Sequence, residues 1–362
     1  MKCRAQILKT LCCATFCLSA LSCAFAQEKA AAPDAGRISE TFKLVSYARV
    51  LYPHGIMPDW DRGYMIHHEP EINYSPETPM VEMYDGVGDR VREGRIWPKG
   101  AANVSIRRAA ATRDGAILAA GGATMRDGSI QGFIVKTDLA GTTVQTVITG
   151  SFMPEQICEA PDGTIWSLGK ILSEDDGQQR NTDVVRQYGF EKGLLHSFLP
   201  EDTVKAVVRS KRPWFNPFDS YVRCGKNKVS VYLSFTKEYV EIDNSSLELN
   251  RWKLDQALTQ QREGDGMAVT EDGRVYLGLQ VFGKPGRSPF RGLYQIKAVS
   301  GQPVAELLPV SGAISFLEPG TVSPPESFVM LWGADGNQLV VWRNGYGSML
   351  SWVSVIQSDS TD

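Results

Sequence analysis

A short turn pattern that recurs at a nearly constant interval constrains this 362-residue chain more than any other feature. The pattern is Asp-x-x-Gly-x-x-apolar, and its clearest copy, at 138–144, stands between two strand-like runs. Six copies, some of them degraded, begin at Asp85, Asp138, Phe190, Asp243, Ala298 and Asn344. The steps between them are 53, 52, 53, 55 and 46 residues. A period in this range indicates a repeat architecture, in which each unit buries its apolar faces against its neighbours.

A second turn pattern alternates with the first. Asp-Gly precedes an apolar run at Asp114, Asp162 and Asp272, and the segments 224–233 and 324–332 are divergent copies. Glycine tolerates the positive φ of a tight turn, so Asp-Gly between apolar runs predicts a hairpin. Each unit then holds an inner, apolar hairpin and an outer hairpin with alternating charges. Four strands in each period of about 50 residues predict an all-β fold, a six-bladed β-propeller of four-stranded antiparallel blades.

We expect one β-propeller domain over residues 41–357, with a two-sheet sandwich as the alternative fold. The first blade has an outer hairpin at 81–97 but no Asp-Gly partner. Either residues 42–66 supply its inner strands, or residues 42–52 pair with the last blade and close the ring. The segment 53–80 is rich in proline and histidine. Its composition predicts an ordered insert or lid and not a strand pair.

The order of the two turns resembles that of the NHL and SMP-30/gluconolactonase-like six-bladed propellers. The unit apolar-x-x-Asp-Gly-x-apolar followed by apolar-x-x-Asp-x-x-Gly covers Ile106 to Val355. The resemblance implies a ring with an axial channel, whose loops at one end bind ligands or partners. The lactonase-like members hold one divalent metal on the axis with Glu, Asn and Asp side chains. Because the shared motifs are turns, the resemblance concerns the fold and transfers no catalytic residue.

The first 26 residues have the pattern of a signal peptide. Lys2, Arg4 and Lys9 form a basic start, an uncharged and mostly apolar run follows, and Ala24-Phe25-Ala26 offers a cleavage site. We expect cleavage after Ala26, a secreted or periplasmic protein, and no transmembrane segment in the mature chain. Residues 27–40 are then a flexible tether. Removing the leader changes the formal net charge from −3 to −6, and no basic stripe suggests a nucleic-acid partner.

Only Cys158 and Cys224 lie outside the leader. An exported protein with two cysteines can form one disulfide. Both residues precede predicted turns in neighbouring repeats, so the sequence allows a bridge and, equally, two separate buried thiols. Neither has a nearby histidine, which argues against a catalytic thiol.

The one cluster of potential metal ligands lies in the 53–80 segment, which contains three of the four histidines. Imidazole and carboxylate groups together suit zinc, iron or copper. The candidates for one divalent metal are His54, Asp59, Asp61, His67, His68 and Glu69. The alternative is a polar loop on the propeller surface without a cofactor, because no His-x-x-x-His or Cys-x-x-Cys spacing is present. The catalytic residues are not predicted.

Other residues with chemical potential have simpler interpretations. The sequence contains no Gly-x-Ser-x-Gly motif and no phosphate-binding loop. Asp114, Asp162 and Asp272 are interpreted as turn formers. Arg107 and Arg108 precede an inner strand, so one of them is placed to face the channel and meet an anion, although a solvated rim is the favoured interpretation.

These observations predict an exported, monomeric binding or scaffold protein. It would engage a small molecule, a glycan or a protein through its loop face. A metal-dependent, lactonase-like hydrolase is the alternative. A fold of this kind does not define a function.

Overall fold

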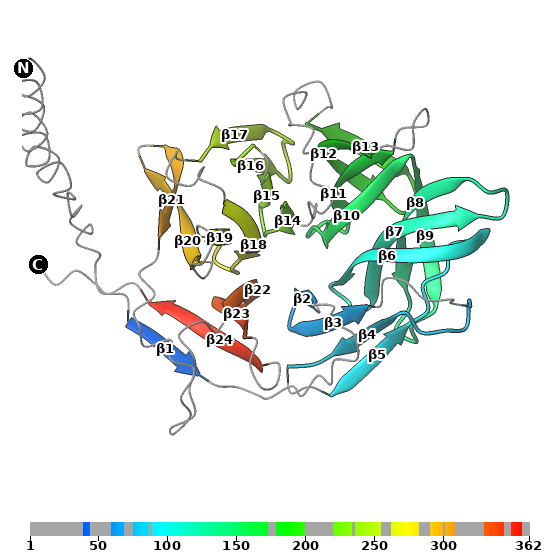
Figure 1. Cartoon of the computed structure of the whole chain (residues 1–362), viewed down its shortest axis with the longest axis horizontal. Coiled ribbons are helices and arrows are strands. Elements are labelled where there is room, and N and C mark those ends of the chain that lie inside the picture. Colours follow the sequence, from blue (N-terminus) through cyan, green and yellow to red (C-terminus); the bar gives the residue numbers. More distant parts are fainter. Residues whose placement is uncertain are drawn as a thin grey trace, which may run out of the picture. The chain divides into compact units, whose positions relative to one another are not determined.

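Six four-stranded antiparallel sheets follow one another along the chain (Figure 1). The computed structural model describes residues 39–43, 59–68, 75–86, 89–172, 179–199, 220–233, 236–254, 262–281, 290–299, 301–307, 329–343 and 349–356. The first sheet contains β2 (Asp59–Asp61), β3 (Tyr64–His68), β4 (Val81–Tyr84) and β5 (Arg90–Gly94). The second contains β6 (Ala101–Ala111), β7 (Ile117–Met125), β8 (Ile130–Thr137) and β9 (Thr143–Gly150). The third contains β10 (Phe152–Glu159), β11 (Ile165–Leu172), β12 (Gln179–Gly189) and β13 (Gly193–Phe198). The fourth contains β14 (Tyr221–Cys224), β15 (Lys228–Leu233), β16 (Glu238–Asp243) and β17 (Leu249–Lys253). The fifth contains β18 (Arg262–Val269), β19 (Val275–Val281), β20 (Phe290–Val299) and β21 (Gln302–Leu307). The sixth contains β22 (Val329–Asp335), β23 (Gln338–Arg343), β24 (Met349–Ile356) and β1 (Ser39–Lys43).

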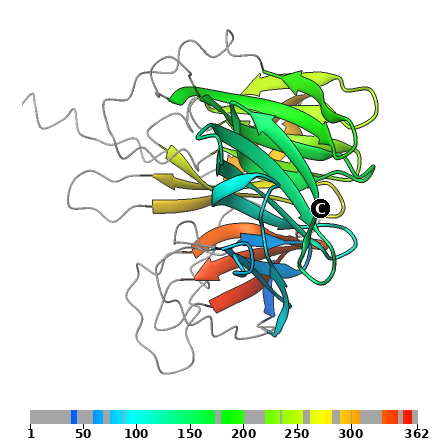
Figure 2. The ribbon, with the colours of Figure 1, turned by 90° about the vertical axis from the view of Figure 1, so that its right-hand side faces the viewer.

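The sheets form a closed ring. The first strand of each sheet lies nearest the centre and contacts the first strand of the next sheet, and β22 returns to contact β2. The last sheet takes its outermost strand from the start of the chain, because β1 pairs antiparallel with β24. In the view of Figure 2 the strands run along the ring axis and twist strongly. The predicted six-bladed β-propeller is confirmed.

Apolar clusters fill the spaces between consecutive sheets. One joins the first and second sheets through residues such as Met83 and Phe133. Another joins the third and fourth sheets, where Trp166 and Val231 are completely buried. A sheet that is apolar on both faces cannot cover them alone, so stacking around an axis is what removes this surface from water.

The two repeated turns lie where the sequence predicts them. Gly115, Gly163 and Gly273 adopt positive φ of 77°, 81° and 86° in the inner hairpins. In each of these turns the residue two positions before the Asp donates its amide hydrogen to the carbonyl of the residue after the Gly, as from Thr112 N to Ala116 O at 2.9 Å. Gly141, with φ of 81°, lies in the outer turn between β8 and β9.

Two predictions about the first and last blades need correction. Residues 59–68 are not part of an insert: β2 and β3 form the inner hairpin of the first blade, joined by the two-residue turn Arg62-Gly63 with φ of 50° and 82°. The turn signal was missed because Arg occupies a position where Asn or Asp is usual. In the last blade the divergent copy at 324–332 was placed wrongly, because Val329–Asp335 is the first strand, and the turn follows at Gly336. The 344–350 copy then joins the second and third strands, which explains its shorter step.

The start of the ring also differs slightly from expectation. Strand β1 begins at Ser39, two residues inside the segment expected to be a tether. Both alternatives for the first blade hold in part, since residues near the start close the ring and residues up to His68 supply the inner hairpin.

A disulfide joins Cys158 at the end of β10 to Cys224 at the end of β14, with Cα atoms 5.6 Å apart. The bridge, one of the two alternatives that the sequence allows, therefore ties the inner strands of the third and fourth blades. Among the residues that the structure describes, no helix has the length and apolar character needed to cross a membrane.

Candidate functional site

Four of the six predicted metal ligands lie on the inner hairpin of the first blade. Asp59 and Asp61 belong to β2, and His67 and His68 to β3, whereas His54 and Glu69 lie outside the described residues.

The described members of this set have different surroundings. Asp61 Oδ2 accepts a hydrogen bond from the Ala111 amide at 3.1 Å, while His67 Nδ1 lies 3.8 Å from Glu82 Oε2. Across the described part of the chain, no three His, Cys, Asp or Glu side chains gather closely enough to hold a metal ion. The metal site, which also includes residues outside that part, stays a prediction.

The inner strands are linked to one another at the end of the ring that carries the Asp-Gly turns. Arg62 Nη2 donates to the Glu159 carbonyl at 2.6 Å, and the Arg113 amide donates to Glu159 Oε2 at 2.6 Å. Together with the bond from Ala111 to Asp61, these contacts form a turn-end cluster that joins the first three blades.

The same end is linked across the other blades. Arg223 Nε of β14 donates to the Met267 carbonyl of β18 at 3.0 Å. Trp60 Nε1 of β2 donates to the Ala334 carbonyl of β22 at 3.4 Å. The polar groups at this end therefore bind one another and hold the ring together.

Asp61 is the acidic centre of the turn-end cluster. Burial raises the pKa of its carboxyl above the ordinary value, because protein atoms replace most of the water around it. The positive charges of Arg62, Arg223 and Arg108, and the hydrogen bond from Ala111, oppose this rise in pKa. Desolvation is the largest of these influences, so the charged form of Asp61 is disfavoured relative to water.

A β-bulge recurs at the middle of four inner strands. The register against the second strand shifts by one residue, and the extra residue is Arg107 in β6, Glu155 in β10, Asp265 in β18 and Trp332 in β22. In the first three strands this residue lies four positions before the last pair of the hairpin. Bulges redirect side chains and are frequent beside active sites. Three of the four residues are charged: Arg107, Glu155 and Asp265.

In the third blade the bulge is used for an internal ion pair. Lys170 Nζ lies 3.3 Å from Glu155 Oε1, and the two residues are only 1% and 7% exposed. Lys170 stands opposite Met153, two residues before the bulge. The two opposite charges thereby avoid the cost of isolated burial.

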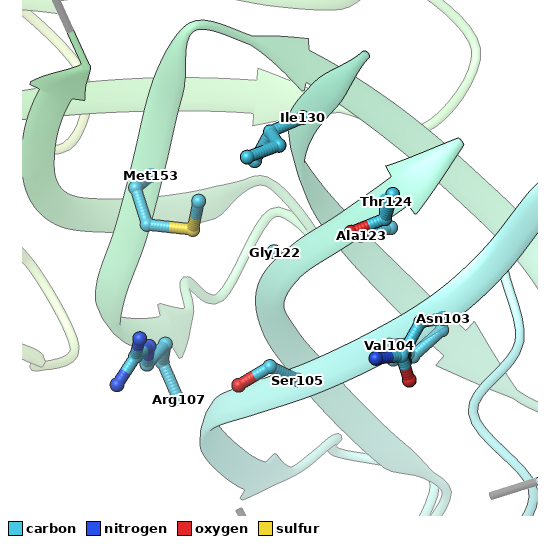
Figure 3. Close-up of a pocket in the computed structure, with 9 residues that line it drawn as sticks. All are labelled: Asn103, Val104, Ser105, Arg107, Gly122, Ala123, Thr124, Ile130 and Met153. Atoms are coloured by element: carbon cyan, nitrogen blue, oxygen red, sulfur yellow. Dashed lines mark hydrogen bonds between the residues drawn. The ribbon is translucent and has the colours of Figure 1, made fainter. Parts of the chain in front are cut away.

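In the second blade the corresponding arrangement leaves a pocket. Gly122 stands opposite Ser105, two residues before Arg107, and so occupies the place that Lys170 has in the next blade. A pocket of ≈ 140 Å³ lies here, and Figure 3 shows the Met153 side chain pointing toward Gly122, with Ser105 and Arg107 below them in that view. Its lining consists of Asn103, Val104, Ser105, Arg107, Gly122, Ala123, Thr124, Ile130 and Met153.

Arg107 is the charged group of this pocket. Its side chain is half-buried, and it makes no hydrogen bond or ion pair with any residue that the structure describes. Arg107 and Arg108 lie within the inner strand β6 and not before it, as the sequence had suggested. Arg107 lines the pocket, and Arg108 lies within electrostatic range of Asp61.

Sequence reasoning missed the remaining pocket residues. No ligand-binding motif contains Asn103, Ser105 or Met153, and Met153 meets the other two only because β6 and β10 are neighbours in the ring. One signal was available in the sequence, since Arg107, Glu155 and Asp265 each stand seven residues before the Asp of an Asp-Gly turn.

Comparisons with known proteins support the fold. No protein-family model matches this chain, and no curated protein matches its sequence. The structure is similar to that of a Bacteroides fragilis protein provisionally described as exported, with a TM-score of 0.52 and 11% identity over 89% of this chain and 97% of that one. A luciferin-regenerating enzyme (TM-score 0.45, 12% identity, 88% and 96% covered) and the PQQ-bound aldose sugar dehydrogenase of Streptomyces coelicolor (TM-score 0.45, 12% identity, 89% and 100% covered) have lower scores. At 11% identity the similarity to the Bacteroides fragilis structure concerns the fold alone, and none of these comparisons transfers an activity.

Proposed function

We propose that this protein is an exported β-propeller that binds a small ligand in the pocket between its second and third blades. The observation that carries the proposal is Arg107, which a bulge directs into a pocket that also contains apolar side chains. Pockets that combine apolar walls with a few polar groups are the usual form of small-molecule sites.

The ligand would enter from the end of the ring opposite the Asp-Gly turns. The pocket residues Asn103 and Thr124 are neighbours across β6 and β7. They lie far from the 112–116 turn and near the connection between β7 and β8. At the turn end, by contrast, Arg62 and Glu159 are engaged in the turn-end cluster. This arrangement supports the loop face as the binding face.

Export is supported by the leader and by the disulfide. The basic start, the apolar run and the Ala24-Phe25-Ala26 site have the order of a secretory signal. The Cys158–Cys224 bridge fits an oxidising compartment. Mass spectrometry of the mature protein tests this point, and we expect an N-terminus at Gln27.

A ligand-observed NMR screen of small polar compounds against the mature chain tests the binding function. We expect hits that are lost in Gly122→Val, because a Cβ at this position would lie 2.7 Å from Met153 Cε and would push that side chain into the pocket. Gly189→Ala is the control, since its Cβ would make only ordinary contacts, 3.5 Å and beyond, with Leu195. The proposal fails if no compound binds, or if the hits bind Gly122→Val as well as they bind the parent protein.

The lactonase-like hydrolase is not proposed, because no contact among the described residues favours it. Metal analysis of protein purified without an affinity tag tests that alternative directly. One bound divalent ion per chain would support it.

A further inference from the structure

The charge balance of the pocket indicates what kind of ligand it takes. Arg107 is the one charged residue in the described lining, and no carboxylate lines the pocket with it. Glu155, which occupies the same bulge position in the third blade as Arg107 does in the second, forms an ion pair with Lys170. The half-buried guanidinium of Arg107 makes no ion pair with a described residue, so its N–H donors are available to an anionic ligand.

The shape of the guanidinium narrows the choice among anions. Its planar fork of N–H donors matches a carboxylate in a bidentate pair. A single cation balances one negative charge and not two. The remaining polar groups of the lining are uncharged: the Ser105 and Thr124 hydroxyls and the Asn103 amide.

The rest of the pocket is apolar and small. Met153 and Ile130 face the same space as Arg107 in Figure 3. The ≈ 140 Å³ volume is well below the range of about 300–1,000 Å³ that is common for drug-sized ligands. The pocket therefore suits a molecule with a short hydrocarbon body.

We infer that the pocket binds a short-chain aliphatic carboxylate, with the carboxylate paired to Arg107 and the hydrocarbon chain packed against Met153 and Ile130. This inference rests on the proposed binding function and adds the class of ligand. Ile130, which is 62% exposed, would be partly covered by the bound molecule.

Isothermal titration calorimetry of the mature chain with butyrate, butyramide and sulfate tests the inference. Butyrate and butyramide have nearly the same size and differ in charge, while sulfate carries two charges and no hydrocarbon body. We expect butyrate to bind most tightly, and Arg107→Gln to weaken its binding by about ten- to hundredfold, because a charge-assisted pair is lost. Lys192→Gln removes a positive charge in the exposed turn between β12 and β13 and is the matched control. Its affinity should equal that of the parent protein.

The possible results separate the ligand class from the binding function. If butyramide binds as tightly as butyrate, or if Arg107→Gln leaves butyrate binding unchanged while Gly122→Val abolishes it, the carboxylate inference is overturned and the binding function stands. If sulfate binds more tightly than butyrate, the site takes inorganic anions and the inference is again overturned. If none of the three probes binds, the inference falls, and the compound screen decides the binding function by itself.

Discussion

The second and third blades contain the same bulge and use it in opposite ways. In β10 the bulged Glu155 is neutralised by Lys170, and both are buried. In β6 the bulged Arg107 faces a pocket, because Gly122 stands where the third blade has Lys170. Two residue differences, one at the bulge and one on the second strand, thus give an ion pair in one blade and a pocket in the next. The difference between the two bulges lies in side-chain volume and charge, and the backbone is shared.

Breaking the ion pair of the third blade should have the largest effect on stability. Lys170→Met removes the positive charge that lies 3.3 Å from the buried Glu155, and we expect a loss of about 3–5 kcal/mol. Denaturant unfolding measures it. Lys228→Met is the control, since its pair with Glu241 is partly exposed and should cost at most about 1 kcal/mol. Equal losses in the two variants would contradict the assigned role of Lys170.

Removing the disulfide should have the next largest effect and should spare the pocket. The Cys158→Ala/Cys224→Ala variant frees a closed segment of 66 residues, and we expect a loss of about 2–4 kcal/mol. The same unfolding experiment checks this value. Butyrate affinity should stay unchanged, because the bridge ties the third blade to the fourth and the pocket lies between the second and third. A parallel loss of affinity would show that the third blade does not behave as a separate unit.

Asp61→Asn should raise stability in a pH-dependent way. The raised pKa means that the folded protein binds a proton more readily than the unfolded chain. The stabilisation from Asp61 is complete below the unfolded pKa and is lost as pH rises through the folded pKa. The stability of the variant relative to the parent protein should therefore increase as pH rises above about 4, the ordinary pKa of an aspartate in an unfolded chain. Thermal unfolding over this pH range measures the gain, and a constant or decreasing difference would contradict the predicted direction.

Arg107→Ala should have the smallest effect on stability and a clear effect on binding. Because Arg107 has no partner among the described residues, we expect a change within about 0.5 kcal/mol. Denaturant unfolding and butyrate titration of the same preparation separate the two effects. A loss as large as that of Lys170→Met would mean that the bulges of the second and third blades have the same role.

Much of the fold was predictable because turns are local. The Asp-Gly and Asp-x-x-Gly patterns depend on backbone conformations that a few residues impose, so their spacing yields the strand count and the number of blades. The prediction was wrong where local chemistry is unusual, at Arg62-Gly63 and in the shortened last blade.

The sequence by itself determined the repeat, the six blades and most of the turns, because each depends on residues close together in the chain. The tertiary structure alone decided that Cys158 meets Cys224 and that Arg107 lines a pocket beside Met153. These contacts join different blades, and their geometry depends on how closely two sheets approach. A bulge shifts that geometry by one residue, and a glycine opposite it creates space. Neither effect follows from a residue's immediate neighbours, so only the packed ring defines the site.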